Sequence, residues 1–135
     1  MNYWLIKFSP KRSSWVDILV NGKFTMRGVR NYQARNYLKE MALSDSVLYY
    51  HSQYELQVMG IMKVIRTAYQ DISSSDTKWV SVDFKPVKTL GNPVTLKKIK
   101  ETKELQNIAI IKQPRLAVMP ITEYEFDTLL HLSGG

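Results

Sequence analysis

The chain has 135 residues, of which 44% are hydrophobic and 23% are charged, and its formal net charge is +7. This length and composition are typical of one folded domain, so we expect residues 1–135 to form a single domain. The sequence has no cysteine and no secretory signal pattern, and its apolar runs are all much shorter than the roughly 18 residues needed to span a membrane. Together these features favour a cytoplasmic protein.

The first half of the chain is predicted to alternate strands and helices. Residues 2–8 and 46–51 have the composition of strands. Ser14, followed three residues later by Asp17, predicts the start of a short helix between these two strands. Asn31 is expected to cap a second helix that runs to about residue 41.

Two longer strands are predicted in the middle of the chain. Residues 56–69 are apolar on both faces around their middle, which predicts a strand buried on both sides. Residues 78–88 alternate more cleanly and predict a strand with one apolar face. The polar segment 71–78 between them is expected to be an exposed loop.

The last third is predicted to hold two helices and one short strand. After the sequence GNP, at 91–93, a helix is expected from Thr95, and residues 115–121 predict a strand that ends near Pro120. Thr122 and Glu125 form a capping pattern for a final helix. Strands of mixed separation with short peripheral helices predict an α+β domain built on a curled sheet or open β-barrel.

The positive charge is confined to one part of the sequence. Residues 1–39 contain eight lysines and arginines against one acid, whereas residues 40–135 contain eleven bases and eleven acids. This segment is either a solvated basic face or a surface for a polyanion, and clustering favours the second because it concentrates the field.

The sequence offers little for catalysis. His51 and Ser52 are neighbours on a predicted strand, so their side chains point to opposite faces and do not form a base–nucleophile pair. His131 lies near a helix end, and no carboxylate cluster or phosphate-loop motif accompanies either histidine. We therefore expect no enzyme activity, no metal site and no cofactor.

The segment GVRNYQARNYL, residues 28–38, is unusually rich in hydrogen-bond donors and flat rings and contains no acid. Ala34 and Leu38 are expected to pack one side of its helix, which leaves the N-terminal half free for a partner. Aromatic residues on the neighbouring strands either belong to the core or line a pocket with it. Rings that stack on a base, amides that bind its edge and arginines that bind phosphates are typical of nucleic-acid binding.

Several segments together resemble the EVE domain, a family of the PUA-like superfamily. They are NYWLIK, GVRNYQARNYLKEM, VLYYHS, VMGIMKVIRTAY, KWVSVDF, PVTLKKIK and RLAVMPIT, in this order along nearly the whole chain. The resemblance implies a PUA-like sheet ringed by short helices. It also implies a pocket, between the sheet and the GVRNYQARN helix, for a modified base flipped out of DNA or RNA.

The resemblance and the residue pattern together give one set of candidate binding residues. Pro120 is expected near the rim of the pocket. The full set is Trp4, Lys7, Phe8, Ser9, Met26, Arg30, Asn31, Tyr32, Gln33, Arg35, Asn36, Tyr50, His51, Ser52, Trp79 and Pro120.

Two positions depart from the pattern of the family. Met26 stands where a tryptophan is usual, with Arg27 after it where an acid is common, and KFSP at residues 7–10 replaces the usual KSEP. Methionine stacks less well than tryptophan but adapts to irregular shapes. Either Phe8 supplies the missing aromatic wall, or the ligand differs.

The predicted function is a non-catalytic, monomeric module that recognises a modified base in DNA or RNA. The alternative is an accessory protein that takes part in RNA processing or associates with tRNA. Such a protein would bind the RNA backbone without selectivity for a modified base. Only the first should distinguish modified from unmodified strands of the same sequence.

Overall fold

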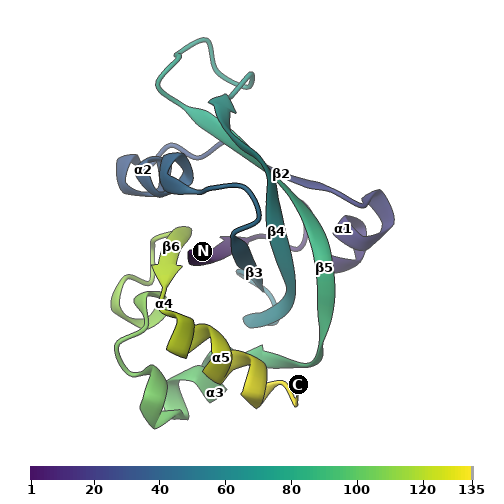
Figure 1. The fold of residues 1–135 in the computed structure, drawn as a ribbon, viewed down its shortest axis with the longest axis vertical. Coiled ribbons are helices and arrows are strands. Elements are labelled where there is room, and N and C mark those ends of the chain that lie inside the picture. The colour runs from purple at the N-terminus through teal and green to yellow at the C-terminus, as the bar shows by residue number, and fades with distance from the viewer. Residues whose placement is uncertain (135) are drawn as a thin grey trace.

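A computed structural model of the chain describes residues 1–134 and is built on one curled, six-stranded sheet (Figure 1). The strand order is β2-β5-β4-β3-β1-β6. β1 and β3 are parallel, and the other four neighbouring pairs are antiparallel. The strands are β1 (Tyr3–Phe8), β2 (Phe24–Met26), β3 (Ser46–His51), β4 (Gln57–Gln70), β5 (Val80–Thr95) and β6 (Val118–Ile121).

Short helices surround this sheet, which confirms the expected α+β class. In Figure 1, α3, α4 and α5 gather at one end, and α1 and α2 lie on opposite sides of the long β4–β5 hairpin. No helix within residues 1–134 has both the length and the apolar character to cross a membrane. The helices are α1 (Trp15–Asn21), α2 (Tyr32–Glu40), α3 (Leu96–Glu101), the 3-10 turn η1 (Lys103–Leu105), α4 (Ala109–Lys112) and α5 (Glu123–Leu132).

The predicted helix starts are confirmed. Ser14 and Thr122 each accept a hydrogen bond from the backbone three residues on and form complete capping boxes with Asp17 and Glu125. The side chain of Asn31 accepts from the backbone N–H of Ala34 at 2.9 Å and so begins α2.

Two strand predictions were wrong in detail. β5 runs through the GNP segment to Thr95 because β4 pairs with it as far as Gln57–Thr95. β4 is buried on one face only: Val58, Met62 and Val64 are in the core, while Ile61 on the opposite face is half-buried. The apolar residues on both faces led to the prediction that both faces are buried, but other elements cover only one of them completely.

One close approach fixes α1 against the sheet. A Cβ atom at Gly60 of β4 would overlap the ring of Trp15, so only glycine leaves room for the indole there. The indole N–H of Trp15 donates to the hydroxyl of Thr89 at 2.8 Å. The start of α1 is thereby held against β4 and β5.

Candidate nucleic-acid interface

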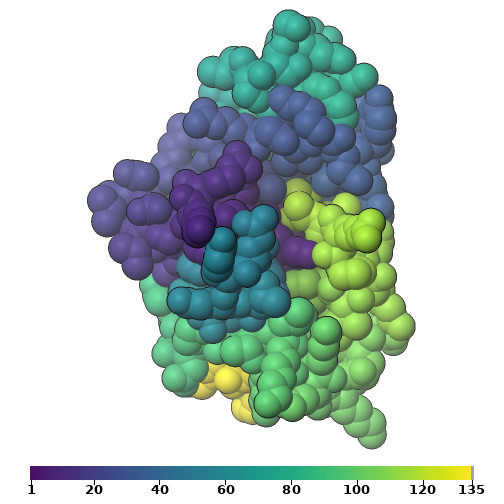
Figure 2. Space-filling model, turned by 180° about the vertical axis from the view of Figure 1, so that it is seen from behind, coloured from purple at the N-terminus to yellow at the C-terminus, as the bar shows by residue number. Residues whose placement is uncertain are grey.

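The end of β1, the loop before α2, the segment after β3 and the segment before β6 meet at one open cleft of about 510 Å³, here called the main cleft. In Figure 2, N-terminal residues, drawn purple, are visible between the teal segment near residue 50 and the yellow-green segment before β6. The lining residues are Lys7, Phe8, Ser9, Lys11, Arg12, Met26, Arg27, Gly28, Val29, Arg30, Asn31, Ala34, Ser52, Gln53, Arg115 and Ala117.

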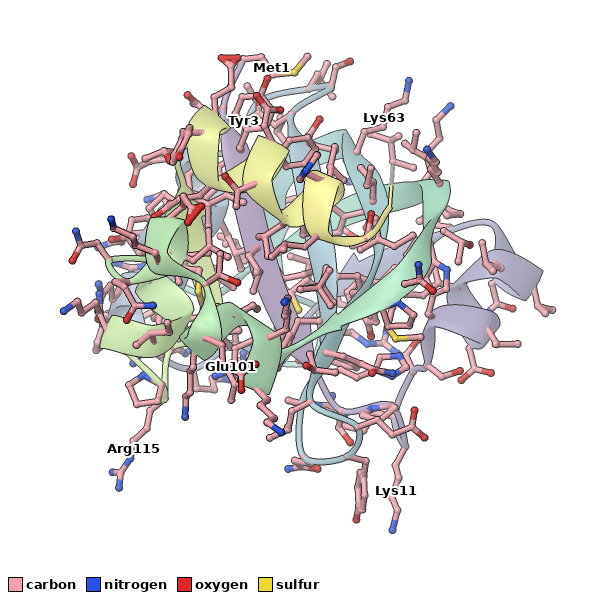
Figure 3. The ribbon with its side chains drawn as sticks, turned by 90° about the horizontal axis from the view of Figure 1, so that it is seen from below. Met1, Tyr3, Lys11, Lys63, Glu101 and Arg115 are labelled. Atoms are coloured by element: carbon pink, nitrogen blue, oxygen red, sulfur yellow. The ribbon has the colours of Figure 1, made fainter. Side chains whose placement is uncertain are left out.

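Every charged side chain that lines the main cleft is basic, and six such residues contribute. Lys11 and Arg115 project from the same side of the molecule in Figure 3, well apart from one another. Such a concentration of one sign of charge attracts anions and raises their local concentration. The six are Lys7, Lys11, Arg12, Arg27, Arg30 and Arg115.

Lys7 differs from the other five because it is partly buried. Burial lowers the pKa of its ammonium group. The Nζ atom donates to the carbonyl oxygen of Pro114 at 2.6 Å, which ties β1 to the segment that carries Arg115. Lys7 therefore supports the cleft as well as contributing to its charge.

The apolar wall of the main cleft is formed by side chains that also belong to the core. Phe8 is 9% exposed and packs edge-on against Phe24, with the two ring centroids 5.0 Å apart. Met26 is 2% exposed. The guanidinium of Arg12 lies over the Phe8 ring, 4.5 Å from its centroid. Phe8 is thus at the expected wall, but a flat cation covers part of its ring.

A buried carboxylate holds the loop at the mouth of the cleft. Gly28 has φ of +77°, a conformation that favours glycine, and its N–H donates to Asp71 at 2.8 Å. Asp71 also accepts from the Arg30 guanidinium at 3.1 Å and from the N–H and hydroxyl of Ser73. Burial alone would raise the pKa of Asp71, but these hydrogen bonds hold it well below its usual range.

A second group of aromatic and basic side chains lies beside the main cleft rather than in it. The rings of Tyr32 and Trp79 are 5.3 Å apart, and Arg30 lies over Trp79. Arg35 and Lys78 lie 5.1 and 5.5 Å from the centroid of Tyr32, which is 55% exposed. We call this group the Tyr32–Trp79 cluster.

The structure brings some of the predicted residues together and separates others. Those that line the main cleft are Lys7, Phe8, Ser9, Met26, Arg30, Asn31 and Ser52. Those that lie outside it, on or beside α2, are Tyr32, Gln33, Arg35, Asn36 and Trp79. Those that lie elsewhere are Trp4, Tyr50, His51 and Pro120.

The four residues that lie elsewhere are held by contacts outside the main cleft or are buried. The indole of Trp4 donates to buried Asp45 at 3.0 Å, and His51 accepts the backbone N–H of Trp15. Tyr50 is buried, which raises its pKa to about 12. Pro120 lies opposite Trp4 on β6 and lines a different cleft, so the expectation that it lies at the rim of the main cleft is corrected.

The residue set also missed groups that the structure brings to the cleft. Lys11, Arg12 and Arg27 are part of the basic N-terminal segment, so the charge clustering could have pointed to them. Arg115 and the supporting Asp71 come from distant parts of the chain, and no local pattern places them there.

A curled sheet with a basic, partly apolar cleft beside α2 defines a PUA-like binding domain, and the chain belongs to the EVE domain family. The family model matches residues 2–132. Mouse thymocyte nuclear protein 1 is 30% identical over 97% of this chain and 73% of its own length.

Solved structures show the same fold. Protein Atu2648 from Agrobacterium tumefaciens is 36% identical with a TM-score of 0.96, covering 99% of this chain and 94% of that chain. Human THYN1 protein, solved in complex with DNA that contains 5-methylcytosine, is 27% identical with a TM-score of 0.92. That match covers 100% of this chain and 99% of the human one.

Proposed function

We propose that this chain is a non-catalytic module, spanning residues 1–135, that binds nucleic acid carrying a modified base and holds that base, flipped out, in the main cleft. The observation that carries the proposal is the composition of this cleft: six basic residues and no acid around an apolar wall. Its volume of about 510 Å³ lies within the range of ligand-binding pockets.

The human relative supports the choice of ligand. THYN1 was solved with DNA that contains 5-methylcytosine, and its structure superposes on this chain along its whole length. Flipping a base costs a few kcal/mol of unstacking. Stacking contributes roughly 1–3 kcal/mol per base, and phosphate contacts add to it.

The side chains in the cleft divide into three tasks. Met26 and Val29 form an apolar wall suited to a methyl group on a base. We assign the polar edge of the base to the NH₂ group of Asn31 and the hydroxyl of Ser52, both of which belong to residues that line the cleft. Capping of α2 uses the amide oxygen of Asn31 and not its NH₂ group, which supports this assignment. The surrounding arginines and lysines bind phosphates.

The predicted residues on α2 and the hairpin form the outer part of the same proposed interface. The Tyr32–Trp79 cluster holds three cations beside two rings, and Arg30 belongs both to it and to the main cleft. A strand that leaves the cleft toward α2 would meet this cluster. Binding of RNA, a monomeric state and a cytoplasmic location stay predictions from the sequence.

A binding panel tests the proposal. Affinity is measured for DNA and RNA strands of one sequence, single and double, with the central base unmodified, methylated or hydroxymethylated. We expect at least one modified strand to bind more tightly than its unmodified counterpart. Equal, salt-dependent affinity for all strands would instead support backbone binding without base selectivity.

A further inference from the structure

A second cleft, of about 370 Å³, lies between β2 and the segment that follows β1. Its charged side chains are Arg12, Lys23 and Arg27, again without an acid in the lining, and Ser13 and Asn21 add polar groups. Three cations around a space of this size favour an anionic ligand.

The second cleft shares a wall with the main cleft. Phe8, Arg12 and Arg27 line both, so the two spaces adjoin at these residues. A ligand held in one cleft therefore lies beside residues that also line the other. Two groups that are joined by a few covalent bonds, such as a base and a backbone phosphate, can occupy both.

The arginines of the shared wall have their charge available. The ion pairs within residues 1–134 involve Lys23, Arg30 and Lys78, but neither Arg12 nor Arg27. Both side chains are exposed, and Arg12 is steadied by its contact with the Phe8 ring. A guanidinium presents its N–H groups in a fork that matches the oxygens of a phosphate.

Lys23 is the third cation and is partly neutralised. Its Nζ atom lies 3.2 Å from the carboxylate of Asp83, which is buried and also accepts hydrogen bonds from Thr25 and Tyr69. An ammonium group has three donors, so this pairing orients Lys23 and leaves donors for a ligand. Arg12 and Arg27 therefore carry most of the unneutralised charge of the second cleft.

We propose that the second cleft binds a backbone phosphate next to the base held in the main cleft, with Arg12 and Arg27 as its principal ligands. This inference rests on the proposed function, because it requires a base in the main cleft. The two clefts then form one track, in which a nucleotide spans the shared wall. A nucleobase without a phosphate would occupy only half of it.

The test pairs one substitution with one neutralised phosphate. Oligonucleotides carrying the preferred modified base are made with a neutral methylphosphonate at each position around that base in turn. Arg27→Gln should weaken binding of the fully charged strand and reduce the slope of log affinity against log salt by about 0.7–0.9. With the neutral linkage at one particular position beside the base, the same substitution should cause no further loss.

Arg66→Gln is the matched control. Arg66 is also exposed and stacked on a ring, that of Tyr69, and it lines neither cleft, so its substitution removes the same charge elsewhere. We expect Arg66→Gln to weaken all strands equally, with no dependence on which phosphate is neutral. The melting temperature of each variant shows that it is folded.

The outcomes separate this inference from the proposed function. In one outcome, wild type prefers the modified strand while the affinity lost through Arg27→Gln adds to the affinity lost through every neutral linkage. In that case the second cleft does not bind the neighbouring phosphate, and this inference fails while the proposed function stands. If wild type shows no preference for any modified base, both fail.

Discussion

The backbone N–H of Trp15 donates to Nε2 of His51 at 3.0 Å, so the first turn of α1 is bonded to the last residue of β3. Only neutral histidine offers an acceptor nitrogen, and protonation would turn the acceptor into a second donor. Burial lowers the pKa of His51, and the charge of Glu55 only partly opposes this effect.

Stability should therefore depend on pH through His51. The unfolded chain takes up a proton near pH 6.5, whereas the folded chain resists it. The free energy of unfolding should be fully maintained above this pH and fall as pH decreases toward the lowered pKa. Urea unfolding across pH 5–8 measures this. His51→Gln should flatten the dependence and His131→Gln, at the only other histidine, should not; the reverse result would mean that His131 causes it.

Asp71→Asn should loosen the mouth of the main cleft. The change leaves one acceptor oxygen for donors from Gly28, Arg30 and Ser73, and it brings an N–H toward them. We expect a loss of about 1–3 kcal/mol in stability, since one buried polar group becomes unsatisfied. Faster hydrogen exchange at the Gly28 N–H would locate the effect. Asp76→Asn, in the exposed part of the same loop, should have little effect on the melting temperature.

Asn31 has two separable roles. Asn31→Ser keeps an oxygen that caps α2, so stability should remain close to wild type. If the NH₂ group binds the base edge, selectivity for the modified strand falls in this variant while the melting temperature is unchanged. Asn31→Ala should lose about 1 kcal/mol of stability as well. Unchanged selectivity in Asn31→Ser would assign the residue to capping alone.

Two substitutions at Phe8 distinguish its role in core packing from its role in stacking on a base. The ring packs on Phe24 and is 9% exposed, so Phe8→Ala should cost roughly 3–5 kcal/mol of stability. Phe8→Leu keeps most of the volume but removes the flat surface beneath Arg12. We expect this variant to stay folded and to lose discrimination between modified and plain bases, measured by competition binding. Full discrimination in folded Phe8→Leu would show that the ring is only a core residue.

Gly60→Ala should disturb the packing of α1 on the sheet by direct contact. The new methyl group would overlap the buried ring of Trp15, and overpacking of this kind costs typically about 1–3 kcal/mol. Thermal unfolding measures the loss. In a Trp15→Phe background, the smaller ring leaves room, so the cost of Gly60→Ala should decrease; an unchanged cost would place the strain elsewhere.

The features that the sequence predicted well are local ones. The caps at Ser14, Asn31 and Thr122 depend on residues within four positions of each other, and each is present. The extension of β5 depends on its partner strand, and the single buried face of β4 depends on what covers it. Neither can be inferred from the strand itself.

The candidate site shows the same limit. The basic N-terminal segment and the residues before α2 were identified from charge and composition, and several of them meet at the main cleft. The roles of His51 and Asp71 arise from partners 36 and 43 residues away. Hydrogen bonds between such distant segments leave no trace in the spacing of residues, so sequence reasoning placed His51 in the pocket and missed Asp71.

The pairing of β1 with β6 has a consequence for synthesis on the ribosome. The main cleft needs residues 7–12 on one side and Arg115 and Ala117 on the other, and β6 follows them at the opposite end of the chain. A nascent chain that has not yet emerged past this segment lacks one side of the cleft, however well its first strands are formed. Ligand binding in the main cleft would thus require that synthesis has passed the residues of β6, because contacts between segments far apart in the sequence cannot form before both segments are available.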